Sequence, residues 1–309
     1  MLGYEEFKNG LLKETGKMLG DRYAVTISKA RKVNLGLTEV LDIFDREAPE
    51  NKPHAIYYLR LYYEKHKDGG TLHGIAGEIA ETQRKLEQCT RKTAEAIKDI
   101  TDFEKCRGRL YFRMVNTDRN REFLENVPHW EMLDLSAVPY MLLRESAETT
   151  ESTAVYSGIV KKWGIPAEEV MGQAYKNAPA LMPAGDVSSV MEMLGNSGVP
   201  GTACRVPELC LLTNIKEMNG FSVVFYPGVL KSVADRFGQN FYILPSSVHE
   251  ALIVPETMGV PPHELKEMVV KTNRESVEET EVLSDNIYFY DREKDELRME
   301  GGGIWNWRR

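Results

Sequence analysis

The chain has 309 residues and a formal net charge of −8, so it lacks the excess of lysine and arginine with which a general nucleic-acid-binding protein displaces counterions from phosphates. Hydrophobic residues make up 42% of the chain and charged residues 28%, which is ordinary for a globular protein and argues against wholesale disorder. At this length we expect two folded units of roughly 150 residues each.

The first hundred residues carry the pattern of a mixed α+β unit. Apolar spacing predicts a helix over 4–19, and alternation predicts a strand over 23–28 followed by an apolar run over 35–44. Residues 55–61 are typical of a strand that runs into a short helix ending at Asp68-Gly69-Gly70, after which Thr71 caps a long helix. That helix ends in a charged stretch, 82–102, which we interpret as the boundary of an N-terminal unit, 1–100.

The rest of the chain alternates short strands and helices. We expect strands over 109–115, 132–143, 153–157, 209–213, 221–226, 241–244 and 252–254. We expect helices over 116–126, 167–177, 187–194, 229–237 and 264–271, and a closing hairpin over 286–299. Pro139 removes a ladder donor, which favours an edge or bulged position for its strand. The fold class is therefore α+β, with two related mixed units of short antiparallel sheets packed with helices, the second over 101–300 and a flexible tail over 301–309.

The candidate for catalysis is the stretch 246–250, where nucleophile-type and base-type side chains crowd together: Ser246, Ser247, His249 and Glu250. Acyl transfer needs a hydroxyl in hydrogen-bond reach of an imidazole that a carboxylate orients. However, successive side chains of an extended strand point to opposite faces, and no G-x-S-x-G elbow is present. We therefore prefer a structural turn, with a serine-type hydrolase that uses Ser246 or Ser247 with His249 as the alternative.

Two further groups are candidates for a ligand or a partner. Asn116, Arg119 and Arg121, with His129 nearby, could hold a phosphate or carboxylate at a helix start, although a helix cap explains the same residues. Trp305 and Trp307 could dock a protein partner, although a frayed terminus is the simpler interpretation. No zinc-type histidine spacing and no phosphate-binding glycine loop occurs, so we expect no metal and no cofactor.

The compartment expected from the sequence is the cytoplasm. The first residues are acidic where a signal peptide is basic, and no apolar run approaches the roughly 18 residues of a membrane span. The scattered cysteines, Cys89, Cys106, Cys204 and Cys210, are expected to be buried or idle thiols.

Four runs of the sequence resemble one bacterial family known only as a domain of unknown function, DUF5688. They are YYLRLYYEKHKDGGTL (57–72), MVNTDRNREFLENVPHWEMLDLS (114–136), YILPSSVHEALIVP (242–255) and VLSDNIYFYDREKDEL (282–297). The resemblance covers nearly the whole chain and implies a fold and a cytosolic bacterial setting, but no activity. We therefore expect a non-catalytic binding or accessory module that has an unidentified ligand or partner and contacts neither nucleic acid nor membrane.

Overall fold

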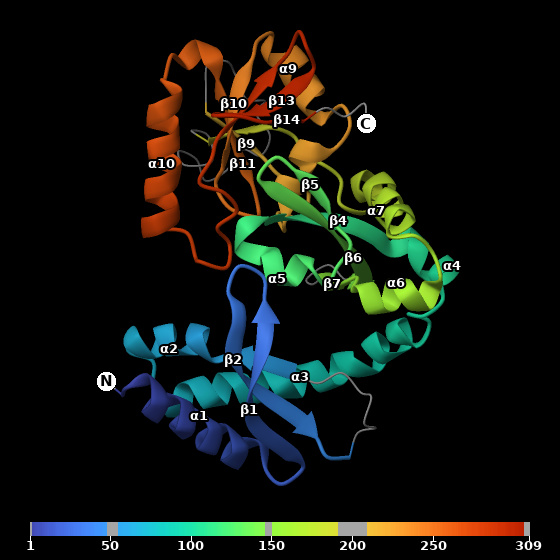
Figure 1. The fold of residues 1–309 in the computed structure, drawn as a ribbon. Helices are drawn as coiled ribbons and strands as arrows, with labels where there is room; N and C mark the ends of the chain where they lie inside the picture. The colour runs from blue at the N-terminus through green and yellow to red at the C-terminus, as the bar shows by residue number, and fades with distance from the viewer. Residues whose placement is uncertain (1, 48–54, 146–149, 191–208, 306–309) are drawn as a thin grey trace. The chain divides into compact units, whose positions relative to one another are not determined.

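The computed structural model describes residues 2–47, 55–145, 150–190 and 209–305. The chain divides into two units, Met1–Ile100 (unit 1) and Thr101–Arg309 (unit 2), which are drawn in Figure 1 and described separately below. Small antiparallel sheets packed with helices make up both units, which confirms the α+β class.

Unit 1 is a three-stranded antiparallel sheet of order β1-β2-β3 with three helices. Its elements in chain order are α1 (Tyr4–Leu19), β1 (Tyr23–Lys32), β2 (Gly36–Asp45), β3 (Ala55–Tyr58), α2 (Leu59–Lys67) and α3 (Leu72–Lys98). As predicted, α1 covers 4–19 and the Thr71 hydroxyl caps α3, accepting the Gly74 N–H at 3.1 Å.

The core of unit 1 lies between its helices and one face of the sheet. Phe7 and Leu11 of α1 pack with Ile79 of α3 and with Leu41 and Ile43 of β2. Because Leu41 and Ile43 are two residues apart, both side chains leave β2 on the same face, toward the helices. Farther along that face toward the hairpin turn lie Glu39 and Leu37, and this is where the pocket described below opens.

Unit 2 contains two sheets, of which the first has β6 at its centre, paired with β4 on one side and with β5 and then β7 on the other. Its elements in chain order are α4 (Phe103–Cys106), η1 (Arg107–Arg109), β4 (Leu110–Asn116), η2 (Asp118–Asn120), α5 (Arg121–Leu124), β5 (Trp130–Met132), β6 (Leu135–Glu145), β7 (Thr150–Ala154), α6 (Ser157–Trp163) and α7 (Ala167–Leu181). The Phe112 ring of β4 stacks on the Tyr175 ring of α7 at 5.6 Å between centroids, so α7 covers one face of this sheet.

Pro139 lies in the central strand, whereas the sequence favoured an edge or a bulge. β5 pairs with β6 as far as Ala137, and β7 begins its pairing at Tyr140. The Pro139 carbonyl accepts a hydrogen bond from the Val155 N–H on this side of β6. The Pro139 nitrogen faces the same side, in the gap between the two partners, so no ladder bond is lost there.

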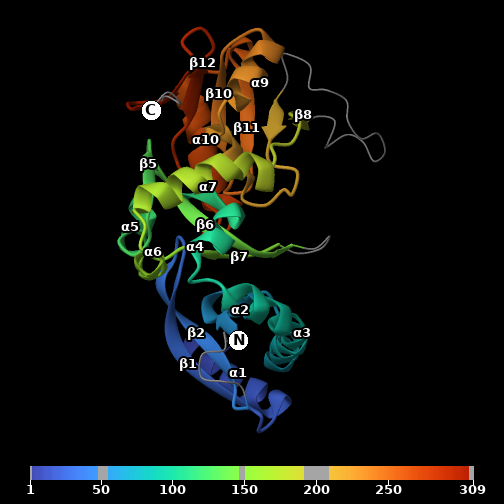
Figure 2. The same ribbon diagram turned by 90° about the vertical axis from the view of Figure 1, so that its right-hand side faces the viewer.

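The second sheet of unit 2 has seven strands in the order β14-β13-β12-β10-β11-β9-β8. Its elements in chain order are β8 (Ser188–Ser189), β9 (Cys210–Leu212), η3 (Gly220–Phe225), α9 (Val229–Phe237), β10 (Phe241–Pro245), β11 (Ala251–Pro255), η4 (Glu256–Met258), α10 (Pro262–Glu275), β12 (Tyr288–Asp291), β13 (Glu296–Met299) and β14 (Ile304–Trp305). Figure 2 shows β10, β11 and β12 side by side, and α10 packs on this sheet through Leu265 and Val269. Phe241 and Ile243 are fully buried, as expected for central strands.

Three segments of unit 2 differ from the prediction. Residues 221–226, predicted as a strand, form the 3₁₀ helix η3, whose residues are all buried. Of the predicted helix 187–194, Ser188–Ser189 form β8 and residues 191–194 lie outside the described residues. In the tail, which we expected to be flexible, Ile304–Trp305 pair with β13 as β14.

The cysteines also differ from the prediction. Cys106 is buried and is not part of a disulfide. Cys210, which is fully buried on β9, is disulfide-bonded, so the expectation of thiols alone is wrong for this residue. Cys204 and the side chain of Cys89 lie outside the described residues.

In the described part of the chain, no helix combines the length and the apolar character needed to cross a membrane.

Candidate functional site

The stretch 246–250 forms the turn that joins β10 to β11. The Ser247 hydroxyl accepts a hydrogen bond from the His249 backbone N–H at 3.0 Å, which is a local serine turn. The Ser246 hydroxyl donates to Glu250 Oε1 at 3.3 Å. Both serines are therefore engaged within the turn itself.

Both ring nitrogens of His249 are directed at groups outside the turn. The Asn219 backbone N–H donates to Nδ1 at 3.3 Å, so this nitrogen acts as an acceptor and the ring proton sits on Nε2. Nε2 lies 3.4 Å from Glu281 Oε1. The Thr213 hydroxyl in turn donates to the His249 carbonyl at 2.7 Å. His249 thus fastens the turn to the segments before η3 and before β12.

This geometry gives the hydrolase alternative no support. A nucleophilic serine needs an imidazole nitrogen free to take its proton, with a carboxylate on the opposite nitrogen. A carboxylate is present at Nε2, but the opposite nitrogen receives a backbone amide instead of a hydroxyl.

The residues expected at a helix start make mainly local contacts. Asn116 Oδ1 accepts the Arg119 N–H at 2.9 Å, and the Asn116 amide donates to the Leu283 carbonyl at 2.9 Å. Arg121 pairs with the exposed Asp118 at 2.6 Å. His129 Nδ1 lies 3.1 Å from the Val127 carbonyl. These contacts do not gather the four candidate residues at one point, and their role as ligand contacts stays a prediction.

Of the two tryptophans in the tail, only Trp305 is among the described residues. The half-buried Trp305 ring packs against Phe225, 6.1 Å between centroids. Its buried indole N–H has no hydrogen-bond partner among the described residues. Trp307 lies outside the described residues, so the docking role of this pair also stays a prediction.

A polar network that no sequence motif indicated surrounds Asp134, in the turn between β5 and β6. One Asp134 oxygen accepts the Tyr288 hydroxyl at 2.7 Å, and the other accepts the Ser284 hydroxyl at 2.6 Å and the Asn286 amide at 3.0 Å. We call these four residues the Asp134 network. It joins runs 114–136 and 282–297, and His249 joins run 242–255 to neighbouring Glu281. Three of the four runs that carry the family resemblance therefore meet in space.

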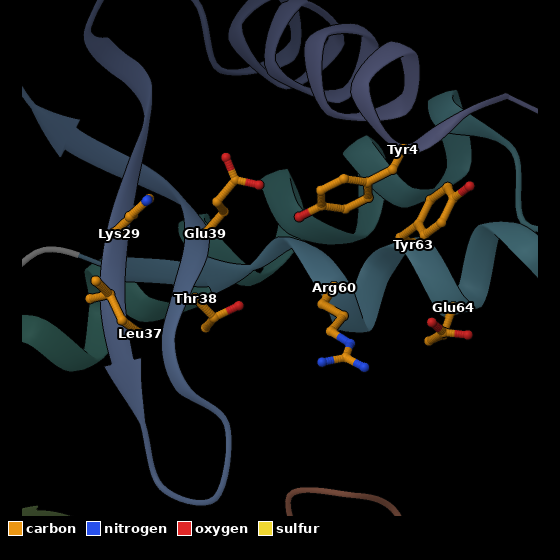
Figure 3. A pocket seen from close by; sticks show the side chains of 8 residues that line it. All are labelled: Tyr4, Lys29, Leu37, Thr38, Glu39, Arg60, Tyr63 and Glu64. Atoms are coloured by element: carbon orange, nitrogen blue, oxygen red, sulfur yellow. The ribbon is translucent and has the colours of Figure 1, made fainter. Parts of the chain in front are cut away.

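A pocket opens on unit 1 between the start of α1, the β1–β2 hairpin and α2 (Figure 3). Its volume is about 540 Å³. The lining combines two aromatic rings, an aliphatic side chain, a hydroxyl, two cations and two carboxylates: Tyr4, Tyr63, Leu37, Thr38, Lys29, Arg60, Glu39 and Glu64. Sequence reasoning missed this pocket because its residues come from four separate elements.

An ion pair, burial and a contact between two aromatic rings hold the side chains at the inner wall of the pocket in place. The Lys8 side chain is only 10% exposed, and its ammonium lies 2.8 Å from Glu39 Oε1 and holds the pKa of Glu39 below its ordinary value. Burial and the Glu39 carboxylate raise the pKa of Tyr4, whose hydroxyl is directed toward Glu39 in Figure 3. The Tyr4 and Tyr63 rings meet edge to face, 5.1 Å between centroids.

No metal centre is formed by the described residues, because no three or more His, Cys, Asp or Glu side chains among them group closely enough to hold an ion.

Fold and site together define a two-unit α+β protein with a mixed-polarity pocket and no serine–histidine dyad at its 246–250 turn. The model of a family of unknown function, DUF5688, matches residues 4–292, and the chain therefore belongs to this family. No curated protein and no solved structure matches it.

Proposed function

We propose that this protein is a non-catalytic binding or accessory module of the bacterial cytoplasm, and that the pocket of unit 1 is its ligand site. The observation that carries the proposal is the pocket itself. Its volume of about 540 Å³ falls in the range of small-molecule sites, and its lining sets a few charged groups among aromatic and aliphatic ones.

The contrast with the 246–250 turn supports a binding role over an enzymatic one. Ser246 and Ser247 are held by hydrogen bonds within the turn, and the His249 ring accepts one from the Asn219 N–H. In the pocket, by contrast, Leu37 is 56% exposed and Lys29 is exposed, so side chains remain available to a ligand.

The binding role is tested by screening a fragment collection with equal shares of cationic, neutral and anionic members, read by amide NMR. We expect some fragments to shift resonances of the pocket residues. Thr38→Trp places a large ring in the pocket and should abolish these shifts. Thr26→Trp puts the same ring at an exposed site of β1 outside the pocket and should leave them unchanged. A screen in which no fragment of any class reaches the pocket would contradict the proposal.

The proposal that the protein is non-catalytic is tested with a serine-directed fluorophosphonate probe. We expect no labelling of Ser246 or Ser247 in the folded protein, because neither hydroxyl donates to the His249 ring, whose Nδ1 accepts the Asn219 N–H instead. Labelling of either serine that His249→Ala abolishes would establish the hydrolase instead.

The cytoplasmic part of the proposal rests on the resemblance to a bacterial cytosolic family, and disulfide-bonded Cys210 stands against it, since disulfides are rare in a reducing compartment. The compartment is tested by lysing cells in iodoacetamide and denaturant, so that cysteines outside disulfides are alkylated. A cytoplasmic protein should give an alkylated Cys210 peptide, with Cys106, which is not part of a disulfide, as the internal control. An unmodified Cys210 peptide beside a modified Cys106 peptide would place the protein in an oxidising compartment.

A further inference from the structure

The two carboxylates of the unit 1 pocket already have cationic partners within the protein. The Lys8 ammonium lies 2.8 Å from a carboxylate oxygen of Glu39 and 2.9 Å from one of Glu5, so it pairs with both. Glu64 forms an ion pair with Lys67 on the same helix. A cationic ligand would have to compete with these internal partners, and at Glu39 the competing Lys8 side chain is largely buried.

The Lys29 ammonium, unlike these two carboxylates, remains available to a ligand. Lys29 stands directly across from Glu39 in the β1–β2 register, so it is fixed at the pocket wall, yet it is exposed. Within the described residues it makes no hydrogen bond or close ion pair, and it acts on Glu39 only at longer range. Lysine offers three donors in such a position. Arg60, on α2, adds a second positive charge to the lining.

The remaining lining suits an apolar body. The edge-to-face pair of Tyr4 and Tyr63 forms one wall, and the exposed Leu37 side chain lies on the hairpin opposite (Figure 3). An aromatic or aliphatic group between them would remove apolar surface from water on both sides.

We propose that the pocket of unit 1 binds a small organic anion that carries an aromatic or aliphatic body, with its anionic group on Lys29 and its body between Tyr4, Tyr63 and Leu37. This inference rests on the proposed function, because it names the ligand class of the same site.

The experiment compares three probes with one apolar body and different charge: 4-phenylbutyrate, 4-phenylbutanol and 4-phenylbutylamine. Each is titrated into the full chain and followed by amide NMR at the pocket residues. We expect the carboxylate to bind most tightly and the amine most weakly. Added salt should weaken the carboxylate and leave the alcohol unchanged, since salt screens exposed charges.

The variant Lys29→Gln should weaken 4-phenylbutyrate by about fivefold and leave 4-phenylbutanol unchanged, as expected for loss of about 1 kcal/mol from one exposed charge pair. Lys13→Gln, at an exposed site of α1 outside the pocket, removes the same charge and should change neither.

The inference is overturned if the amine or the alcohol binds the pocket as tightly as the carboxylate, or if Lys29→Gln behaves like Lys13→Gln. It is overturned as well if none of the three probes reaches the pocket. A pocket that binds probes regardless of charge would leave the proposed function standing and remove only the anion specificity, whereas an empty fragment screen removes the proposed function itself.

Discussion

Individual polar residues in this protein are mostly used for structure, including those that look reactive in the sequence. Ser247 closes a turn, His249 fastens that turn to two other segments, and Asn116 caps a short helix. Asp134, which no motif singled out, accepts three side-chain hydrogen bonds. Because a carboxylate is an acceptor only, it can collect hydroxyl and amide donors from distant segments without needing a donor in return.

The importance of Asp134 can be measured by its removal. Asp134→Ala would leave the hydroxyls of Tyr288 and Ser284, 0% and 1% exposed, without their acceptor. We expect a loss of about 2–4 kcal/mol in the free energy of unfolding, since buried unsatisfied donors cost about 1–3 kcal/mol each. Asp134→Asn keeps one acceptor oxygen and should cost less. Chemical denaturation measures both, with Asp118→Ala at an exposed site as the control; equal stability of Asp134→Ala and that control would contradict the role of the network.

The ion pair between Lys8 and Glu39 should make the stability of unit 1 depend on pH. The hydrogen bond from Lys8 lowers the pKa of Glu39 below its ordinary 4.5, so the contribution of Glu39 is present above pH 4.5 and is lost as pH falls through the lowered pKa. The bond to Glu39, followed by the bond to Glu5, raises the pKa of Lys8 above 10.5, so the contribution of Lys8 is present below pH 10.5 and is lost as pH rises through the raised pKa.

We therefore expect Glu39→Gln to lower the melting temperature of unit 1 by several degrees at neutral pH and by much less well below pH 4.5. Glu81→Gln is the control, because the Glu81–Lys85 pair has side chains 65% and 75% exposed and should matter little at any pH. Thermal unfolding at both pH values measures the difference. A deficit that is the same in acid and at neutral pH would show that charge is not its cause.

At the scale of elements, the spacing of apolar residues was sufficient to predict a helix or strand that has one buried face. The amphipathic helices α1 and α9 end at or next to the residues predicted, and the strands β10 and β11 lie where β-type runs placed them. The strand prediction for residues 221–226 was wrong because Phe, Val and Tyr favour strands. The 3₁₀ helix η3 is buried on every side, so its sequence has no apolar periodicity that indicates a helix. The local turn at Ser247 could be predicted from adjacent residues, but Asp134 and Ser284 are 150 positions apart, and only the folded chain brings them together.

Gly220, where η3 begins, is the glycine whose replacement should disturb this arrangement. A Cβ at this position would lie 2.0 Å from Thr213 Oγ1 and 2.5 Å from the His249 carbonyl oxygen, which are themselves hydrogen-bonded to each other. We expect Gly220→Ala to cost about 1–3 kcal/mol or more, as overpacking does, because the backbone carbonyl cannot move aside freely. In α7, Gly172→Ala meets nothing within 4 Å and should instead stabilise by about 0.5–1 kcal/mol. Urea unfolding that ranks the two variants in the reverse order would contradict the close approach at Gly220.

For the whole molecule, each unit contains buried residues of its own. Leu41 belongs to the core of unit 1, and Ile243 lies fully buried in the larger sheet of unit 2. A unit with its own core can in principle fold and unfold by itself. We therefore expect two unfolding transitions in denaturant, one for each unit.

The variants Leu41→Ala and Ile243→Ala test this expectation, because both leucine and isoleucine are fully buried and each truncation should cost about 2–5 kcal/mol through lost burial and a cavity. Leu41→Ala should lower the midpoint of one transition and leave the other in place, and Ile243→Ala should do the reverse. Tryptophan fluorescence reports unit 2 selectively, since Trp130, Trp163, Trp305 and Trp307 all follow residue 100, while circular dichroism reports both units. A single transition that both variants shift together, with coincident fluorescence and circular dichroism curves, would show that the two units unfold as one cooperative body.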